Sequence, residues 1–256
     1  MRPVVLLLSV VLVVPLVCWG QKETLNIEQI LARMQQARAA ERDHSIAYTV
    51  TREYQLAAEG ASQPSSDVIA QVSFVPPSAK EYAIVKAEGS DRGAGIVRKV
   101  LDHETSMASK PQPHEIDAAN YDIALSGRES LEGHDCYVLQ LSPKREAVEL
   151  VRGQAWVDAR SFQVRRISGV TSKNPSFWIK KLNVTINYGE VNGVWLQTST
   201  KAVADVRVAG THTLSSRAID MQPSTVNASM HIPSKPSSRR ANPRTSVADA
   251  ATWVAR

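Results

Sequence analysis

Side chains that could perform catalysis or bind a metal are scattered through this sequence. The chain has six histidines, each in a different segment, and no Gly-x-Ser-x-Gly elbow, phosphate-binding loop or His-Glu-x-x-His motif. His103-Glu104 is the one adjacent pair suited to metal or acid–base chemistry, but neighbours in a helix point about 100° apart. A site there would need a partner from elsewhere, so we interpret the pair as a solvated helix end.

A second combination with reactive side chains, His134-Asp135-Cys136, lies in an expected strand. Alternation along a strand sends Asp135 to the opposite face from both of its neighbours. We expect Cys136 to pack as a small apolar residue, with a redox or intermolecular role as the alternative for a lone thiol outside the cytoplasm. The sequence therefore predicts no catalytic residue, no metal site and no cofactor, and the protein is not expected to be an enzyme.

The N-terminal segment has the three-part layout of a secretory signal peptide. Arg2 precedes an apolar run from Val4 to Val17, and Cys18-Trp19-Gly20 ends the segment. The run contains a proline and is shorter than the roughly 20 residues that cross a bilayer. The bulky residue before Cys18 argues against lipidation of that cysteine. We therefore expect cleavage after Gly20 and export to the periplasm.

The net charge of +5 is concentrated near the ends of the chain. Residues 223–256 have an excess of basic side chains and are rich in Ser, Pro, Ala and Asn, whereas residues 21–222 have balanced charge. A balanced body offers no basic face to nucleic acid, and the C-terminal segment is too polar to fold. The expected organisation is a signal peptide at 1–20, one domain at 21–222 and a disordered basic tail at 223–256.

Apolar and polar residues alternate over most of the body, which is typical of antiparallel strands. Helical spacing occurs instead at residues 26–43, capped by Asn26, and at residues 95–105. A type I′ turn is expected at Asn192-Gly193. The expected strands cover residues 45–56, 68–74, 82–85, 121–125, 137–141, 148–158, 162–167, 178–188, 194–198, 202–208 and 213–219.

About ten short strands in one sheet must curl. The predicted fold class is mostly β (α+β), a strongly curved antiparallel half-barrel with helices covering its concave face. The inward apolar side chains either fill this half-barrel or leave a ligand cavity beneath the helices, and both alternatives stay open. Candidates for lining the cavity and its helical lid are Ile30, Leu31, Met34, Tyr48, Val50, Val72, Phe74, Ile84, Val97, Leu101, Ile123, Leu125, Leu139, Leu182 and Val184.

Several motifs between about residues 24 and 220 resemble those of the outer-membrane lipoprotein-sorting proteins, the periplasmic Lol carriers and their relatives. The motifs are Phe74-Val75-Pro76-Pro77 with Tyr82 beyond, Tyr121-Asp122-Ile123-Ala124-Leu125, Cys136-Tyr137-Val138-Leu139, Gly153-Gln154-Ala155-Trp156-Val157-Asp158 and Val191-Asn192-Gly193-Val194-Trp195-Leu196. The resemblance implies a half-barrel whose apolar cavity holds acyl chains. The best-known carriers have an Arg-Pro pair, whose arginine holds the lid, where this chain has Pro76-Pro77.

These observations favour a periplasmic binding or carrier protein for a lipid, a lipoprotein acyl chain or another apolar ligand. The alternative is a non-catalytic regulatory or scaffold module of the same fold in the envelope. The expected partners are lipid or lipoprotein acyl chains, with transient contacts to a membrane surface or envelope proteins as further candidates. The protein is expected to be a monomer that does not bind nucleic acid.

Overall fold

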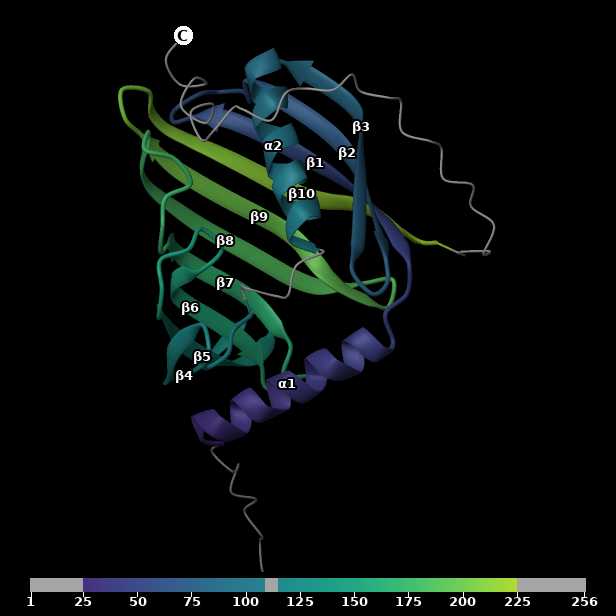
Figure 1. Cartoon of the computed structure of the whole chain (residues 1–256), viewed down its shortest axis with the longest axis vertical. Coiled ribbons are helices and arrows are strands. Elements are labelled where there is room, and N and C mark those ends of the chain that lie inside the picture. Colours follow the sequence, from purple (N-terminus) through teal and green to yellow (C-terminus); the bar gives the residue numbers. More distant parts are fainter. Residues whose placement is uncertain (1–24, 109–114, 225–256) are drawn as a thin grey trace, which may run out of the picture.

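The computed structural model describes residues 25–108 and 115–224, which form one antiparallel sheet of ten strands and two helices (Figure 1). The helices are α1 (Ile27–Asp43) and α2 (Asp91–Ala108). The strands are β1 (Tyr48–Ala58), β2 (Ser66–Val75), β3 (Ala79–Gly89), β4 (Tyr121–Leu131), β5 (His134–Pro143), β6 (Val151–Asp158), β7 (Val164–Thr171), β8 (Ile179–Val191), β9 (Val194–Val206) and β10 (Gly210–Pro223). The predicted fold class, a curved and open antiparallel half-barrel, is confirmed.

The strand order explains why α2 lies on the sheet. The strands follow the order β3-β2-β1-β10-β9-β8-β7-β6-β5-β4, so the two edge strands, β3 and β4, are consecutive along the chain. The chain must cross from one edge of the sheet to the other between them, and α2 lies in that connection. Figure 1 shows α2 in front of the half of the sheet that holds β1, whereas α1 lies along the other end, near β4.

Helix α1 begins after Asn26, the cap that the sequence predicts, and the structure adds a capping box with Gln29. Asn26 Oδ1 accepts a hydrogen bond from the Gln29 amide at 2.8 Å, and Gln29 Oε1 accepts one from the Asn26 amide at 3.0 Å. The inward face of the helix buries Ile30 and Met34 against the sheet. Neither this helix nor α2 is long and apolar enough to cross a membrane.

Two clusters of buried side chains lie at opposite ends of the concave face. The cluster under α1 consists of Leu25, Ile30, Met34, Ile116, Tyr121, Tyr137, Leu139, Leu141, Ala147, Leu150, Ala155 and Val157. The cluster under α2 consists of Val50, Tyr54, Val68, Ala70, Val72, Val97, Leu101, Leu196 and Met221. Each helix therefore packs on its own part of the sheet.

A pair of glycines allows β6 and β7 to approach each other closely beside the cluster under α1, where Leu141 of that cluster is the β5 partner of Gly153. Gly153 and Gly169 are cross-strand partners. A Cβ atom added to Gly153 would lie 2.1 Å from the Ser168 carbonyl oxygen, and one added to Gly169 would lie 2.3 Å from that of Arg152. Neither position can therefore carry a side chain while the two backbones stay this close.

Several boundaries expected from the sequence are wrong. The expected strands 82–85 and 121–125 extend over Ala79–Gly89 and Tyr121–Leu131. The expected strands 194–198 and 202–208 form the single strand β9, because residues 199–201 pair with both β8 and β10 and continue the strand. The expected helix at 95–105 runs from Asp91 to Ala108, although its first turns contain Gly93 and Gly95. The turn at Asn192-Gly193 is confirmed, with φ values of 49° and 80°.

Candidate functional site

The central part of the concave face carries aliphatic side chains that lie outside both buried clusters. We define the central concave face by Leu182, Val184 and Ile186 on β8 and by Ala202 and Ala204 on β9. Cross-strand register places Leu182 beside Ala204 and Val184 beside Ala202. Within residues 25–108 and 115–224, neither cluster includes the three β8 side chains, which are half-buried. This row therefore leaves aliphatic surface open to a further apolar group.

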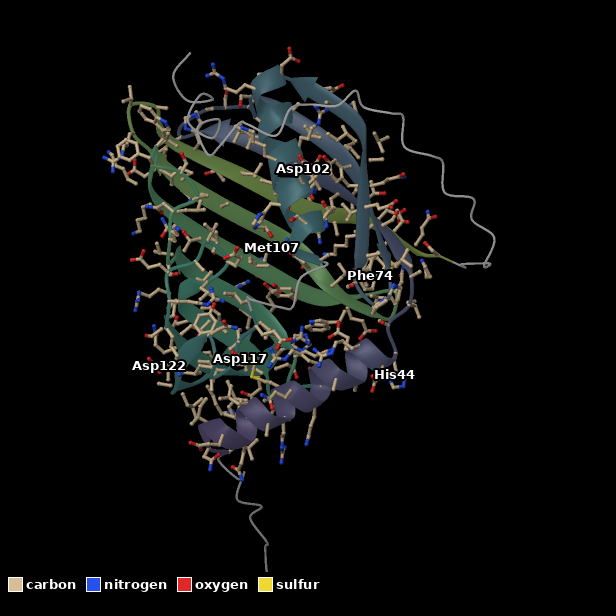
Figure 2. The ribbon with its side chains drawn as sticks, in the orientation of Figure 1. His44, Phe74, Asp102, Met107, Asp117 and Asp122 are labelled. Atoms are coloured by element: carbon tan, nitrogen blue, oxygen red, sulfur yellow. The ribbon has the colours of Figure 1, made fainter. Side chains whose placement is uncertain are left out.

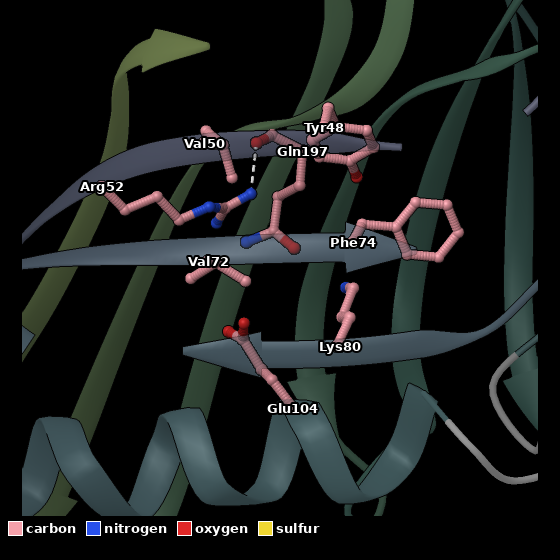
Figure 3. Close-up of a pocket in the computed structure, with 8 residues that line it drawn as sticks. All are labelled: Tyr48, Val50, Arg52, Val72, Phe74, Lys80, Glu104 and Gln197. Atoms are coloured by element: carbon pink, nitrogen blue, oxygen red, sulfur yellow. Dashed lines mark hydrogen bonds between the residues drawn. The ribbon is translucent and has the colours of Figure 1, made fainter. Parts of the chain in front are cut away.

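A small pocket beneath α2 adjoins this face and is lined mainly by polar side chains (Figure 3). The pocket has a volume of about 50 Å³ and is lined by Tyr48, Val50, Arg52, Val72, Phe74, Lys80, Glu104 and Gln197. We call it the polar pocket. Figure 3 shows the Arg52 guanidinium, the Lys80 ammonium and the Glu104 carboxylate pointing toward a common space. Three charged side chains from two strands and a helix thus meet on the inner side of the half-barrel.

Arg52 is the most deeply buried of these charged groups. Its side chain leaves β1 on the same face as Val50 and Tyr54, and the residue is only 6% exposed. Nη2 donates a hydrogen bond to the Gln197 carbonyl oxygen at 2.6 Å, whereas Nη1 is buried without a partner in the part of the chain that the structure describes. A buried cationic donor without a partner is costly, because the charge has lost its hydration.

The charges around Arg52 do not neutralise one another by direct contact. Burial lowers the pKa of Lys80; nearby Glu104 opposes this shift, and Arg52 adds to it. Among the described residues, no ion pair joins Glu104 to either cation. With all three groups ionised, the polar pocket has two cations and one carboxylate, so its net charge is positive.

A second pocket continues from the polar pocket toward the central concave face. We call it the apolar pocket. It has a volume of about 110 Å³ and is lined by Tyr54, Val100, Glu104, Thr200, Ala202, Leu214 and Ser216. Glu104 lines both pockets, and Ala202 is the cross-strand neighbour of Val184. The two pockets and the aliphatic row of β8 therefore form a continuous series of neighbouring residues.

Two tyrosines near this series remain uncharged phenols at neutral pH. Burial raises the pKa of Tyr188 to about 12; Arg52 lowers it and Glu104 raises it. Burial also raises the pKa of Tyr54; nearby Glu104 raises it further, whereas the charge of Arg52 and the proximity of its guanidinium to the hydroxyl lower it. The Tyr54 hydroxyl is buried and lacks a partner in hydrogen-bond geometry among the described residues. It is therefore a second polar group able to bind a ligand.

The candidate site residues predicted from the sequence fall into four groups. Ile30, Met34 and Leu139 are buried in the cluster under α1, and Leu31, Ile123 and Leu125 pack against it. Val97 and Leu101 are buried in the cluster under α2, and Ile84 packs against it. Tyr48, Val50, Val72 and Phe74 line the polar pocket, where the rings of Tyr48 and Phe74 lie 5.3 Å apart. Leu182 and Val184 lie on the central concave face.

Figure 2 shows how the two helices frame this region. Phe74 is labelled between His44, the residue that caps the C-terminal end of α1, and Met107, in the last turn of α2. Tyr82 Oη donates a hydrogen bond to Asp102 Oδ1 at 2.6 Å and ties α2 to the edge strand β3. The end of α2 that carries Glu104 is thereby held beside the polar pocket.

Sequence reasoning missed the three charged residues of the polar pocket, although their spacing places each of them at an inward-facing position. Arg52 continues the inward alternation of Tyr48, Val50 and Tyr54, and Lys80 is two residues before inward Tyr82. Glu104 lies three residues after buried Leu101 on α2. A charge at an expected inward position is uncommon and is the feature that could have identified each residue.

The reactive combinations considered in the sequence do not assemble into a site. His103 is exposed, while its neighbour Glu104 turns to the pockets. No group of three or more potential metal ligands occurs within residues 25–108 and 115–224. Cys136 is fully buried, and burial raises the pKa of its thiol, an effect that Asp158 strengthens and Arg165 opposes. Cys136 therefore packs as the small apolar residue that strand alternation predicts.

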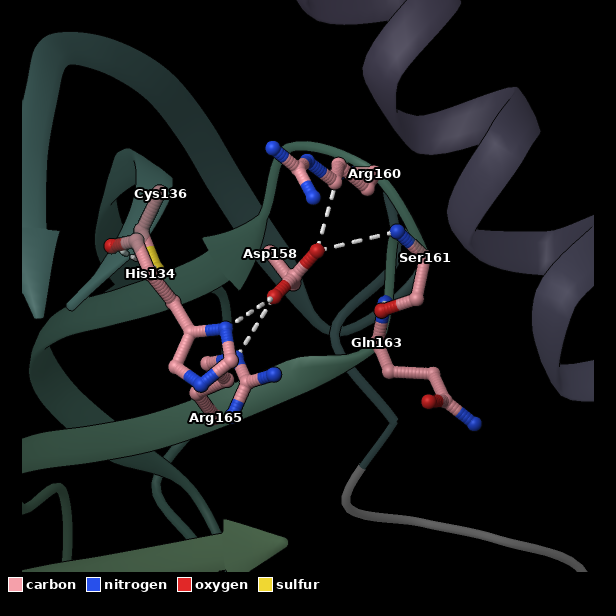
Figure 4. Close-up of polar contacts among 7 residues, drawn as sticks. All are labelled: His134, Cys136, Asp158, Arg160, Ser161, Gln163 and Arg165. Carbon is pink, nitrogen blue, oxygen red and sulfur yellow. Dashed lines mark hydrogen bonds and ion pairs between the residues drawn. The ribbon is translucent and has the colours of Figure 1, made fainter. Parts of the chain in front are cut away.

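A separate polar cluster around Asp158 stabilises the turn between β6 and β7 (Figure 4). Asp158 Oδ1 accepts hydrogen bonds from the amides of Arg160 at 2.9 Å and Ser161 at 3.0 Å. Asp158 Oδ2 lies 2.6 Å from Arg165 Nε and 3.5 Å from His134 Nδ1. Burial alone would raise the pKa of Asp158, but these hydrogen bonds and the Arg165 charge lower it to about 2.

We expect Asp158→Asn to lower the free energy of unfolding at pH 7 by about 2 kcal/mol, because the substitution removes the charge that Arg165 pairs with. The wild-type carboxyl has a folded pKa of about 2, below its reference value of 3.8. Its contribution is therefore complete above the reference value and declines as the pH falls toward 2. Urea unfolding of both proteins across this range should show the two curves converge at low pH.

Asp135→Asn is the matched control, because Asp135 also pairs with an arginine, Arg128, but is largely exposed. Exposed pairs typically contribute less than about 1 kcal/mol. Equal unfolding free energies for Asp158→Asn and the wild type at pH 7 would show that the turn does not depend on this carboxylate.

Comparison with known proteins gives matches of low identity. A family model described as an uncharacterized protein family matches residues 113–223, and the search of curated proteins found no match. A LolA superfamily protein of Nitrosomonas europaea matches with 14% identity and a TM-score of 0.40, over 80% of this chain and 96% of that chain. An outer-membrane lipoprotein-sorting protein domain of Vibrio parahaemolyticus matches with 15% identity and a TM-score of 0.45, over 78% and 94%.

Proposed function

We propose that the mature chain is a non-enzymatic carrier or binding protein for an apolar ligand, such as a lipid or a lipoprotein acyl chain. The observation that carries this proposal is the half-buried aliphatic row of Leu182, Val184 and Ile186 on the central concave face. Each methylene of a ligand that is removed from water gains about 0.8 kcal/mol. An acyl chain lying on this row would thus bind without a charged anchor.

The sizes of the pockets indicate how such a ligand would bind. Pockets that enclose a small molecule usually have volumes of about 300–1,000 Å³, whereas the polar and apolar pockets have about 50 and 110 Å³. They are too small to enclose a whole lipid. A lipid would therefore place one end in the pockets beneath α2 and the rest of its chain against the central concave face, with α2 as the part that covers it.

A regulatory or scaffold module of the envelope is the second candidate, and one exposed apolar surface favours it. Phe177 is 75% exposed and Val208 is 99% exposed. Arg207 joins the two loops, because its Nε donates to the Phe177 carbonyl oxygen at 2.9 Å and its guanidinium lies 4.8 Å from the centre of the Phe177 ring. Exposed aromatic, aliphatic and cationic groups in one place are typical of a contact with a protein partner or a membrane surface.

Export is also part of the proposal, and it rests on the segment at residues 1–20, which lies outside the described residues. The basic tail proposed at 223–256 lies outside them except for its first two residues, and Pro223 ends β10. The proposed site needs neither segment, since its residues lie between β1 and β10. A periplasmic protein would meet lipids and lipoproteins in the compartment where they must be shielded from water.

Native mass spectrometry of the protein purified from the envelope, combined with lipid extraction, tests the proposal. The expected result is a chain that begins near Gln21 together with a bound species that contains an acyl chain. A mature protein that begins at a lipidated Cys18 would place the chain on a membrane. A ligand-free protein that takes up no added acyl chain would contradict the carrier function and favour the module.

A further inference from the structure

We propose that the polar pocket binds a monoanionic headgroup, a carboxylate or a phosphate ester, of a lipid whose chain enters the apolar pocket. This inference rests on the proposed function and adds the chemistry of the ligand's polar end. It is carried by a buried arginine donor without a partner, by the charge of the pocket and by the order of the residues along it. Each of these three observations concerns a different property of the site.

The first observation is the hydrogen bonding of Arg52. The guanidinium is planar and presents donors in a fixed fork, so it suits an anion with two oxygens. The Gln197 carbonyl oxygen takes up Nη2, and Nη1 is left without a partner although Arg52 is only 6% exposed. Natural proteins seldom leave such a donor unsatisfied. An anionic oxygen in the polar pocket would complete the hydrogen bonds of this side chain.

The second observation is the balance of charge. Arg52 and Lys80 face the pocket together with Glu104 (Figure 3). A ligand with one negative charge would bring the sum of these charges to zero, whereas a cationic ligand would add to an existing excess. The remaining lining residues, Tyr48 and Gln197 among them, are neutral. The pocket is thus complementary to a monoanion.

The third observation is the arrangement of polar and apolar surface. The polar pocket, at about 50 Å³, has room for a few water-sized groups, since one water needs about 10–15 Å³. A carboxylate or a single phosphate group fits this scale, and a sugar does not. Beyond Glu104 the lining changes to Val100, Leu214 and Ala202. A single-chain lipid with its headgroup at Arg52 would therefore place its first methylenes in the apolar pocket.

The test compares three ligands with chains of the same length and different ends: oleate, the phosphodiester oleyl methyl phosphate, which is also a monoanion, and the neutral methyl oleate. Binding of each to the full mature chain is measured by displacement of the uncharged dye Nile red. Hydrogen bonds to charged groups contribute about 1.5–3 kcal/mol. We therefore expect at least one of the two anionic ligands to bind about 10-fold to 100-fold more tightly than methyl oleate. The ratio of oleate to oleyl methyl phosphate affinity distinguishes a carboxylate from a phosphate ester of the same charge.

Arg52→Met should remove this preference, which is measured within the variant as the ratio of its affinities for the anionic ligands and for methyl oleate. Lys80→Met, at a half-exposed position, should also reduce the preference for the anionic ligands. This variant replaces Arg52→Met in the test if Arg52→Met does not fold. The control is Arg152→Met, which removes the same charge from an exposed position on the opposite face of β6. It should leave all three affinities unchanged.

The outcomes separate the two proposals. Equal affinity of the wild type for the anionic and neutral ligands would overturn the headgroup site while leaving the carrier function in place. Preference retained in both Arg52→Met and Lys80→Met would also overturn it. Binding of none of the three ligands would contradict the carrier function and the headgroup site together.

Discussion

Ala202→Trp is expected to lower the affinity for methyl oleate by about 50-fold. Ala202 lines the apolar pocket and lies between Val184 of β8 and Leu214 of β10 in the cross-strand register. An indole at this position would fill the space that the first part of an acyl chain needs. Loss of contact for about three methylenes costs about 2.4 kcal/mol, which corresponds to this factor. The neutral ester is the ligand of choice here, because it has no charge and its affinity therefore reports mainly on contacts of the chain.

Lys201→Trp is the matched control for this experiment. Lys201 is the preceding residue of the same strand, is exposed, and points to the opposite face of the sheet. The control adds the same indole to the same strand, so its affinity for methyl oleate should equal that of the wild type. Thermal unfolding of both variants measures any cost of overpacking. Unchanged binding by a folded Ala202→Trp protein would show that the chain does not lie on the central concave face.

The fold could be predicted from the sequence because its local signals agree with one another. The capping box at Asn26, the alternation along β1 and the turn at Asn192-Gly193 each specify a structure within a few neighbouring residues. The pairing of β1 with β10 is different, since it joins Tyr48 to Pro223 across nearly the whole domain. A periodic pattern identifies strands and does not identify distant partners, so the strand order came only from the structure.

The site was harder to predict because it depends on exceptions to the pattern. Leu182, Val184, Tyr48 and Phe74 were found as inward apolar residues, and the structure places them on the central concave face or at the polar pocket. The same reasoning passed over Arg52, since a charge was not expected inside. An inward charge can either pair with another group or line a pocket, and the sequence does not show which. For Arg52 on β1 the answer depends on Gln197 of β9, which is distant in the sequence.

The sequence analysis left open whether the space beneath the helices is filled by side chains or contains a cavity. In the structure the answer differs between α1 and α2. Leu31 and Met34 were predicted as parts of a lid over a cavity. Met34 is only 1% exposed in a packed cluster, and no α1 residue lines either pocket in the described part of the chain, so the lid role of α1 stays a prediction. Glu104 and Val100 of α2 do line them. The physical reason is that α1 lies at the β4 end of the sheet, where large side chains from β4, β5 and β6 fill the space.

Ile30→Ala should therefore destabilise the protein by about 2–5 kcal/mol and leave ligand affinity unchanged. Ile30 has no exposed surface and is buried in the cluster under α1, so its truncation creates a cavity in a packed core. Leu31 is only half-buried against the same cluster, and Leu31→Ala should cost less. Urea unfolding gives the change in stability, and Nile red displacement by methyl oleate gives the affinity of the folded protein.

Gln36→Ala, on the exposed face of α1, controls for a change in the helix itself and should leave the unfolding free energy within about 0.5 kcal/mol of the wild type.

The results for Leu31 and Ile30 distinguish the two roles of α1. If Leu31→Ala weakens ligand uptake more than it lowers stability, α1 covers the ligand as a lid, and the acyl chain reaches the end of the sheet that carries β4. If Ile30→Ala lowers stability alone, the acyl chain is confined to the region between α2 and the central concave face.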